Sequence, residues 1–383
     1  MVTSEILCGG FALSILWTLA LYPVLLSLKA RRGRVVDVGP FEPTVTAVIP
    51  VHNGAGFLAD KIESVLRSDY PADKLDILVL SDASTDETDE IAERYVATGR
   101  VRFLRLPRGG KAAALTAAFE RVDREIVLLT DVRQPLERDC VLLLMSRFHD
   151  PTVGAVSGSL KIRRGETSGE LSTGLYWRYE SWIRRNLSRI DSVLGATGPI
   201  YAVRRTFVRP LPIGCILDDM WLPYQVVLEG KRAVLAEDAV AWDYPTSLTS
   251  EFRRKVRTQA GLYQLLKHEP RLLHPSRNRL FWPFIMLKLG RLFLPHLLIG
   301  TLIASFWLPG PWKMILVAAQ AAFYATYFID AALPETSAVK RITSPIAAFI
   351  VLVTAAFYAQ SIFFADPSTL WKTTQVRVMK ARD

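Results

Sequence analysis

The segment that most constrains this chain is residues 6–28, ILCGGFALSILWTLALYPVLLSL, in which no side chain is charged. As a helix it is long enough to cross the hydrocarbon core of a bilayer. A cleaved signal peptide fits less well, because no basic stretch precedes the segment and the basic cluster KARRGR follows it. Since basic residues stay in the cytoplasm, we predict that residues 1–30 are a transmembrane anchor with the N-terminus outside.

The chain becomes apolar again in its last quarter. Three transmembrane helices are predicted within residues 292–365, near Leu292–Leu308, Trp312–Leu333 and Ile346–Ala365. Before them, residues 277–291 mix aromatic side chains such as Trp282 with basic ones such as Lys288. That mixture predicts an amphipathic helix lying in the membrane interface. The alternative is that these residues form the first turns of the next span.

The basic C-terminal tail, residues 366–383, does not fit this count of spans. Four spans that start from an outside N-terminus would return the tail to the outside, yet it contains the basic stretch WKTTQVRVMKARD. Either one span is miscounted or the tail is an exception to the positive-inside rule, and the sequence leaves both possibilities open.

Charge and cysteine content argue against three classes of protein. The formal net charge is +10, but much of the excess flanks hydrophobic segments, where it orients the chain and meets anionic lipid. We therefore expect a lipid bilayer as a partner and no nucleic acid. The three cysteines are scattered without metal-ligand spacing, so neither a disulfide framework nor a zinc site is predicted.

Residues 44–158 alternate between β-branched apolar runs and helical patterns. Strands are predicted at residues 44–51, 76–84, 101–107 and 125–131, and helices at 57–68, 84–96 and 111–122. This alternation predicts an α/β domain with a parallel sheet, which binds ligands at the carboxyl ends of its strands. The side chains expected at those ends are Pro50, His52, Asn53, Asp82, Lys111 and Asp131.

Four segments, VTAVIPVHN, DILVLSDASTDET, GGKAAALTAAF and VLLTDVRQP, have the order and spacing of the family 2 glycosyltransferases. GATGPIYAVRR, ILDDMWLP and RRKVRTQAG extend the resemblance over roughly residues 44–268. One motif alone is weak evidence, but seven in order are strong. The chain is most similar to the membrane-bound branch that includes cellulose, hyaluronan and chitin-oligosaccharide synthases. The resemblance implies a GT-A fold with a mixed, mostly parallel sheet in a cytosolic domain at residues 40–270.

The resemblance implies that the tips Pro50, His52 and Asn53 contact a nucleotide-sugar donor. Asp82 stands where the family recognises the nucleotide base, and a carboxylate can accept the imide N–H of uracil. Its alternative role is to cap the following helix, a role that Ser84 can also perform. Lys111 follows two glycines and opens a helix, which is a natural seat for diphosphate oxygens. An exposed surface lysine is the alternative.

Asp131 occupies the place of the family's DxD motif, whose acids hold a divalent cation. Mg²⁺ or Mn²⁺ needs only one or two protein carboxylates beside phosphate and water. The third position of the motif is Arg133, which departs from the family pattern. Either Asp131 alone holds the cation, or Arg133 itself supplies positive charge to the diphosphate.

The pair Asp218 and Asp219 supplies two adjacent acids. An inverting transfer needs a base to take the proton of the acceptor hydroxyl. The resemblance assigns this role to Asp219. We expect Asp218 to support Asp219 without contacting the substrate. The alternative is that both acids cap the helix that follows. Gly198 lies in a glycine-rich turn that either passes close to the acceptor or is simply a tight loop.

The segment RRKVRTQAG stands where the family has QxxRW. Arg254 takes the Gln place, Arg257 keeps the arginine, and Thr258 replaces the tryptophan. We expect both arginines to bind the donor. The missing aromatic face puts long-chain processivity in doubt, because sugars commonly stack on such a face.

Together these features predict an integral protein of the inner or plasma membrane. Its activity would be inverting transfer of a sugar, with a UDP-sugar as the expected donor, to a glycan or lipid-linked acceptor. Two alternatives are single-sugar transfer to a lipid without polymerisation and a non-catalytic, nucleotide-sugar-binding subunit of a membrane complex.

Overall fold

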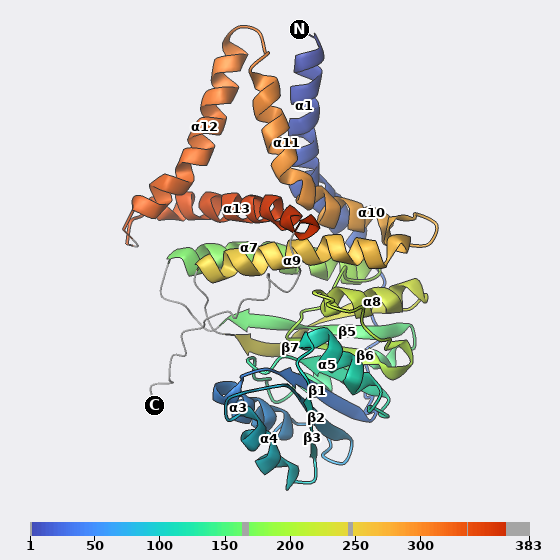
Figure 1. Cartoon of the computed structure of the whole chain (residues 1–383). Coiled ribbons are helices and arrows are strands. Elements are labelled where there is room, and N and C mark those ends of the chain that lie inside the picture. The colour runs from blue at the N-terminus through green and yellow to red at the C-terminus, as the bar shows by residue number, and fades with distance from the viewer. Residues whose placement is uncertain (1, 163–167, 244–247, 335, 365–383) are drawn as a thin grey trace.

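A seven-stranded sheet lies at the centre of the α/β domain (Figure 1), in the strand order β3-β2-β1-β4-β6-β5-β7. The computed structural model describes residues 2–162, 168–243, 248–334 and 336–364. The strands are β1 (Val45–Val51), β2 (Leu75–Asp82), β3 (Val101–Leu106), β4 (Ile126–Thr130), β5 (Val153–Ile162), β6 (Ile200–Arg204) and β7 (Arg232–Asp243).

The predicted alternation of strands and helices is confirmed. β1 to β4 fall on the four predicted runs, and α3 (Ala55–Leu66), α4 (Thr88–Val96) and α5 (Gly110–Phe119) lie between them. β1 pairs in parallel with both β2 and β4, and β2 pairs in parallel with β3. Every residue of β4 is buried, which explains why its sequence reads as an uninterrupted apolar run.

The second half of the sheet departs from a purely parallel order. β6 runs antiparallel to both of its neighbours, β4 and β5, whereas β5 and β7 pair in parallel. The mixed, mostly parallel sheet implied by the resemblance is therefore confirmed.

Helices cover both faces of the sheet and form two hydrophobic cores. One core contains apolar side chains of α3, α4 and α6 (Cys140–Met145), and the other contains those of α5, α7 (Ser168–Ile190) and α8 (Asp218–Leu228). Ile62 of α3 is fully buried, so an Ile62→Ala change is expected to cost roughly 2–5 kcal/mol of stability.

Within the residues that the structure describes, four helices are long and apolar enough to cross a membrane: Ser4–Ala30, Phe281–Ser305, Pro311–Ala332 and Lys340–Phe363. They contain α1 (Val2–Leu16), α2 (Tyr22–Ala30), α10 (Phe281–Phe284), α11 (Gly290–Ser305), α12 (Pro311–Ala332) and α13 (Lys340–Tyr358). They lie on the side of α7 and α9 (Leu248–His268) that faces away from the sheet (Figure 1).

The prediction of a separate interfacial helix at residues 277–291 is wrong. Helical backbone is continuous from Phe281 through a π-helical stretch at Ile285–Leu289 into α11. The structure therefore agrees with the alternative, in which these residues are the first turns of the next apolar helix.

Candidate active site

The loops that follow β1 and β2 meet at the carboxyl edge of the sheet. Asn53 and Ala83 both have a φ of +51°, a left-handed conformation that is strained for alanine. The Asn53 side chain accepts a hydrogen bond from the Thr85 backbone N–H at 2.8 Å, and His52 Nδ1 lies 2.8 Å from the Asp82 carbonyl oxygen. His52 and Asn53 are thus brought to Asp82, whereas Pro50 lies within strand β1, opposite Leu80.

Asp82 binds the loop that precedes α5. Its carboxylate accepts hydrogen bonds from the backbone N–H groups of Gly109 and Gly110, at 2.6 Å and 3.0 Å, and pairs with Arg108 at 2.6 Å. The free amides predicted to receive phosphate are therefore bound to a carboxylate here. Asp82 positions this loop, and its contact with a base stays a prediction.

Neither Asp82 nor Ser84 caps helix α4. The helix begins only at Thr88, whose backbone N–H donates to Asp86 at 3.1 Å. Ser84 Oγ instead accepts the backbone N–H of Asn53 at 3.1 Å. The capping prediction for Ser84 is wrong because the helix starts one turn later than the sequence pattern indicates.

Lys111 forms ion pairs with two of the predicted acids. Its ammonium lies 2.9 Å from Asp131 Oδ1 and 3.2 Å from Asp218 Oδ1. Burial acts to lower the pKa of Lys111, but the charges of Asp131 and Asp218 raise it well above its ordinary value. Lys111 is therefore a permanent positive charge between the end of β4 and the start of α8, and it is not the solvated surface lysine of the alternative reading.

Asp218 and Asp219 occupy the first turn of α8, where the partial positive charge of the helix N-terminus favours carboxylates. Asp218 is held by Lys111 and by the Tyr201 hydroxyl, which donates to its Oδ2 at 2.7 Å. Asp219 has no side-chain hydrogen bond or ion pair with any residue that the structure describes. Of the two acids, only Asp219 is available for an incoming group.

Asp219 faces the glycine-rich turn. A β-carbon placed on Gly198 would lie 3.1 Å from Asp219 Oδ2, so the glycine leaves the carboxylate its space. Burial, together with the charge of Asp218, raises the pKa of Asp219 to about 7. A carboxylate with that pKa is a better proton acceptor near neutral pH than an ordinary aspartate.

Arg133 is bound by an acid from the far end of the domain. Its Nε and Nη2 donate to the two carboxylate oxygens of Asp243 at 3.1 and 3.0 Å. The side chain of Asp243 is only 4% exposed. The hypothesis that Arg133 supplies charge to a diphosphate loses its support, because that charge is already neutralised.

Helix α9 brings a second basic group towards the acids. Burial lowers the pKa of Arg257, while the charges of Asp131 and Asp219 oppose this change. The charge of Arg254, three residues earlier on α9, also lowers the pKa of Arg257. Arg257 therefore joins Lys111 as a positive charge near the carboxylates.

Two residues that position the site were not predicted from the sequence. Lys61 is fully buried in α3 and donates to Thr130 Oγ1 at 2.6 Å and to the Gln134 carbonyl at 2.5 Å, so it fixes both ends of the loop that contains Asp131. Burial lowers its pKa to about 7. Arg184 of α7 donates to Thr197 and Ser157 at 2.7 Å and holds the turn before Gly198. Both side chains contact residues that are distant in the sequence, so no local sequence pattern predicts these contacts.

A divalent cation fits this site only in part. The Asp131 carboxylate is 35% exposed and pairs with the Lys111 ammonium. Within the described ranges no group of three or more His, Cys, Asp or Glu side chains is arranged to hold a metal. The residues present therefore suit a cation that takes most of its ligands from a diphosphate and water.

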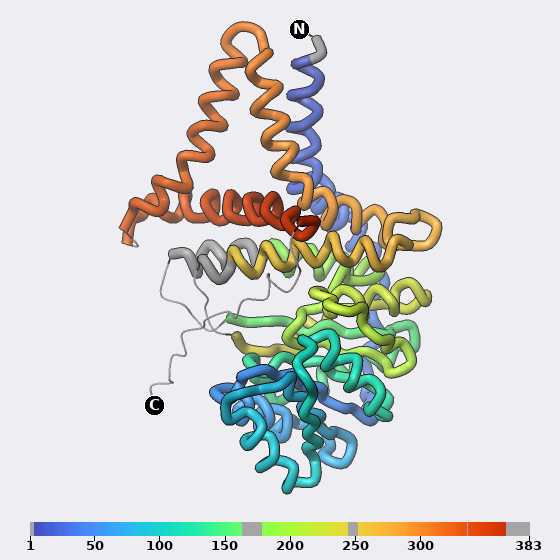
Figure 2. The backbone as a smooth tube through the Cα atoms, viewed as in Figure 1, coloured from blue at the N-terminus to red at the C-terminus, as the bar shows by residue number. Residues whose placement is uncertain are grey.

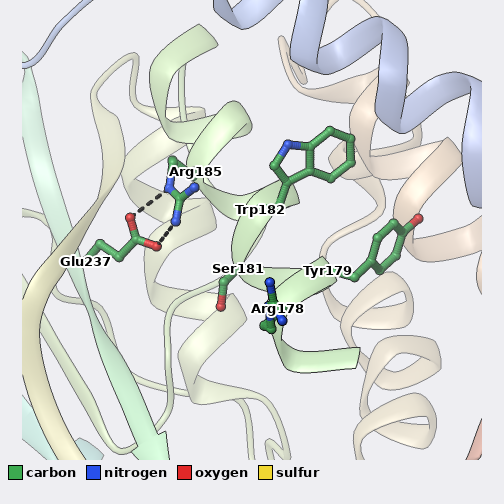
Figure 3. A pocket seen from close by; sticks show the side chains of 6 residues that line it. All are labelled: Arg178, Tyr179, Ser181, Trp182, Arg185 and Glu237. Atoms are coloured by element: carbon green, nitrogen blue, oxygen red, sulfur yellow. Dashed lines mark hydrogen bonds and ion pairs between the residues drawn. The ribbon is translucent and has the colours of Figure 1, made fainter. Parts of the chain in front are cut away.

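A cavity of about 630 Å³ lies elsewhere, between α7 and β7 (Figure 3). It is lined by Arg178, Tyr179, Ser181, Trp182, Arg185 and Glu237, and the Arg185 guanidinium pairs with Glu237. The Tyr179 hydroxyl donates to the Leu19 carbonyl of the first apolar helix at 2.7 Å. None of the predicted site residues lines this cavity, so it is distinct from the candidate active site.

Comparison with known proteins agrees with this geometry. Residues 46–211 match the family described as glycosyl transferase family 2. An N-acetylglucosaminyltransferase of Azorhizobium caulinodans is 30% identical over 181 residues, which are 46% of this chain and 45% of that protein. A poly-beta-1,6-N-acetyl-D-glucosamine synthase of Staphylococcus aureus is 24% identical over 233 residues, 58% of this chain and 55% of that protein. The chain thus spans about half the length of the curated relatives it matches.

One solved structure resembles nearly the whole chain. The mannosyltransferase PcManGT from Pyrobaculum calidifontis, in complex with GDP-Man and Mn²⁺, aligns with a TM-score of 0.67 at 24% identity. The alignment covers 91% of this chain and 98% of that protein. At this identity the likeness establishes the fold, which is GT-A as expected.

Proposed function

Residues 46–211 place this chain in glycosyltransferase family 2, and we propose that it is a membrane-anchored, inverting glycosyltransferase. It moves a sugar from a nucleotide-sugar donor to a glycan or lipid-linked acceptor. The observation that carries the proposal is the convergence of Lys111, Asp131 and Asp218 within ion-pair distance, with Asp219 unengaged beside them.

In the proposed reaction the acceptor hydroxyl attacks the anomeric carbon while the bond to the donor diphosphate breaks. Asp219 takes the hydroxyl proton as the new bond forms, which its pKa of about 7 allows near neutral pH. Attack from the face opposite the diphosphate inverts the anomeric configuration, so an α-linked donor gives a β-linked product. Asp218 keeps Lys111 and Tyr201 in place and takes no proton.

Positive charge is needed where the diphosphate departs. Lys111 and Arg257 are two basic groups whose charges act on the acids at this point, and we assign them to the diphosphate oxygens. A Mg²⁺ or Mn²⁺ ion beside Asp131, when bound, neutralises charge on the same leaving group. The solved mannosyltransferase carries Mn²⁺ with its donor, which supports a divalent cation here.

The donor is assigned by class, and a UDP-sugar is our first expectation. Both curated relatives are named for N-acetylglucosamine transfer, which favours a UDP-linked N-acetylhexosamine. The solved mannosyltransferase holds GDP-Man. A guanine ring can donate to a carboxylate as uracil does, so Asp82 alone does not decide between the two bases.

The apolar helices favour an acceptor at the membrane surface. They lie against α7 and α9 of the catalytic domain, on the side where a lipid-linked or growing glycan would arrive (Figure 1). Thr258 stands where the family has tryptophan and offers no aromatic face to a long chain. This favours transfer of one or a few sugars over extended polymerisation.

A radiolabelled nucleotide-sugar screen tests this proposal. Membranes containing the chain are incubated with UDP-GlcNAc, UDP-Glc, UDP-Gal, GDP-Man and related donors, with and without EDTA. Transfer from one donor, reduced by EDTA and restored by Mg²⁺ or Mn²⁺, supports the proposal, and product length separates single transfer from polymerisation. Donor binding without either transfer or donor hydrolysis would favour the non-catalytic subunit instead.

A further inference from the structure

Helix α13 is oriented differently from the other long apolar helices. α1, α11 and α12 extend away from the catalytic domain, whereas α13 runs across their near ends (Figures 1 and 2). It lies between these helices on one side and α7 and α9 on the other. By length and composition α13 could cross a bilayer, but its orientation is that of a helix in the membrane plane.

Contacts near the C-terminal end of α13 fix it to the catalytic domain. Tyr358 packs edge-on against Phe252 of α9 with ring centroids 5.9 Å apart, and Phe363 packs against Tyr263 of α9 at 4.9 Å. On the opposite side, the Gln360 amide lies 2.8 Å from His296 Nε2 of α11. This end is therefore held between a catalytic-domain helix and a membrane helix.

The other end of α13 is fixed by a polar turn. Asp330, in the last turn of α12, accepts hydrogen bonds from the hydroxyls of Thr343 and Ser344 at 2.6 and 2.7 Å. Lys340 and Arg341 begin α13 at the same place. Charged and hydroxyl groups gathered in this way belong at a membrane surface and not in the hydrocarbon core.

A helix that packs against the catalytic domain cannot also cross the bilayer beside α11 and α12. Its outward side chains are nonetheless apolar, with Ile342 71% and Phe357 48% exposed. Apolar groups on a helix in this position suit the boundary between headgroups and acyl chains. The fourth apolar segment in the sequence, α13, is thus explained as a helix that does not cross the bilayer.

We propose that α13 lies along the membrane surface on the catalytic side and that the chain crosses the bilayer three times, through α1–α2, α10–α11 and α12. This rests on the membrane anchoring in the proposed function. Phe364, the last described residue, then lies on the side of the catalytic domain. The basic residues Lys372, Arg377, Lys380 and Arg382 would obey the positive-inside rule, which a four-span chain violates.

Depth measurements test the orientation of α13 directly. The native cysteines Cys8, Cys140 and Cys215 are buried, so a thiol spin label reacts with an introduced exposed cysteine. The full-length Ile342→Cys and Thr354→Cys variants are labelled in nanodiscs, and immersion depth is read by EPR with a polar and an apolar relaxant. For a helix in the membrane plane we expect equal, shallow depths. A spanning helix would place residue 354 near the bilayer centre, ~10 Å deeper than residue 342, which would overturn the proposal.

A matched pair on α12 is the control. Trp312→Cys and Ala321→Cys replace exposed side chains at the start and in the middle of a helix that spans in either account, and residue 321 should lie ~13 Å deeper than residue 312. Equal depths for this pair would overturn the three-span proposal together with the anchoring. The readout uses no enzymatic activity, so a failure of the transferase proposal leaves it unchanged.

Sidedness gives an independent second test. A fluorescent protein or an alkaline phosphatase is fused after Asp383 of the full chain, and a thiol-reactive, membrane-impermeant reagent is applied to Pro309→Cys in the turn between α11 and α12. We expect a fluorescent C-terminal fusion, an inactive phosphatase and outside labelling of residue 309. An active phosphatase would mean that α13 crosses the membrane.

Discussion

Arg133 and Asp243 form a two-pronged ion pair, with donor–acceptor distances of 3.1 and 3.0 Å, between the loop after β4 and the end of β7. The pair accounts for the departure from the DxD pattern. The position that carries a second acid in many relatives here carries a base, and this base ties two distant strands together. The motif therefore retains one carboxylate for chemistry, Asp131, and uses its third position for structure.

Arg133→Gln should lower stability more than it weakens donor binding. The substitution removes both hydrogen bonds from Arg133 to the buried Asp243, a loss of roughly 3 kcal/mol. Thermal unfolding in detergent and titration with UDP measure the two effects separately. Arg138→Gln, which removes an exposed pair with Asp69, is the control and should change neither. An Arg133→Gln protein of normal stability that no longer binds nucleotide would return Arg133 to the diphosphate.

Gly198→Ala should slow transfer without weakening the donor complex. The new methyl group would meet Asp219 Oδ2 at 3.1 Å and push the carboxylate away from the acceptor. A displaced catalytic group commonly costs on the order of 100-fold in rate. Steady-state kinetics should show this loss in kcat at nearly constant donor KM. Gly56→Ala, at an open position in α3, is the matched control and should behave as the native chain. An unimpaired Gly198→Ala enzyme would contradict the placement of the base.

Lys111→Met should weaken donor binding by roughly 10- to 100-fold, because a charged hydrogen bond contributes about 1.5–3 kcal/mol. The change also leaves Asp131 and Asp218 without their shared cation. Calorimetric titration with UDP and with uridine separates the diphosphate contribution, since only UDP binding should suffer. Lys74→Met, which removes a surface pair with Glu42, serves as the control. Equal losses for UDP and uridine would point to a structural role for Lys111.

The pH dependence of kcat should report the Asp219 carboxyl. Burial and Asp218 raise its pKa to about 7, and the base is active only when deprotonated. The rate should therefore be constant above that pH and fall about tenfold per unit well below it. Donor affinity measured at the same pH values shows whether binding is also lost. A kcat that is unchanged between pH 5.5 and 8 would argue against Asp219 as the base.

Much of the fold follows from the sequence because its cause is local. β1, β2 and β4 are buried on both faces and therefore appear as apolar runs, and the parallel arrangement brings His52, Asp82 and Asp131 to one edge. The insertion of β6 between β4 and β5 has no local signal. It depends on pairing between residues far apart in the chain, such as Leu129 with Tyr201.

The partners of the site residues were harder to predict for the same reason. The sequence indicates that Asp82, Lys111 and Asp131 share an edge, but not that Asp82 binds the glycine amides or that Lys111 bridges two acids. The orientation of α13 is a similar case. Length and apolarity are encoded locally, whereas contacts such as Tyr358 with Phe252 decide whether the helix crosses the membrane or lies on it.

The central claim is that Asp219 removes the acceptor proton, and Asp219→Asn in the full-length protein tests it most directly. The amide is nearly isosteric but cannot accept the proton, so transfer should fall by roughly 1000-fold or more. Calorimetric titration with the donor nucleotide should still give an affinity close to that of the native chain. Loss of donor binding by a folded Asp219→Asn protein, or transfer at a near-native rate, would contradict the account.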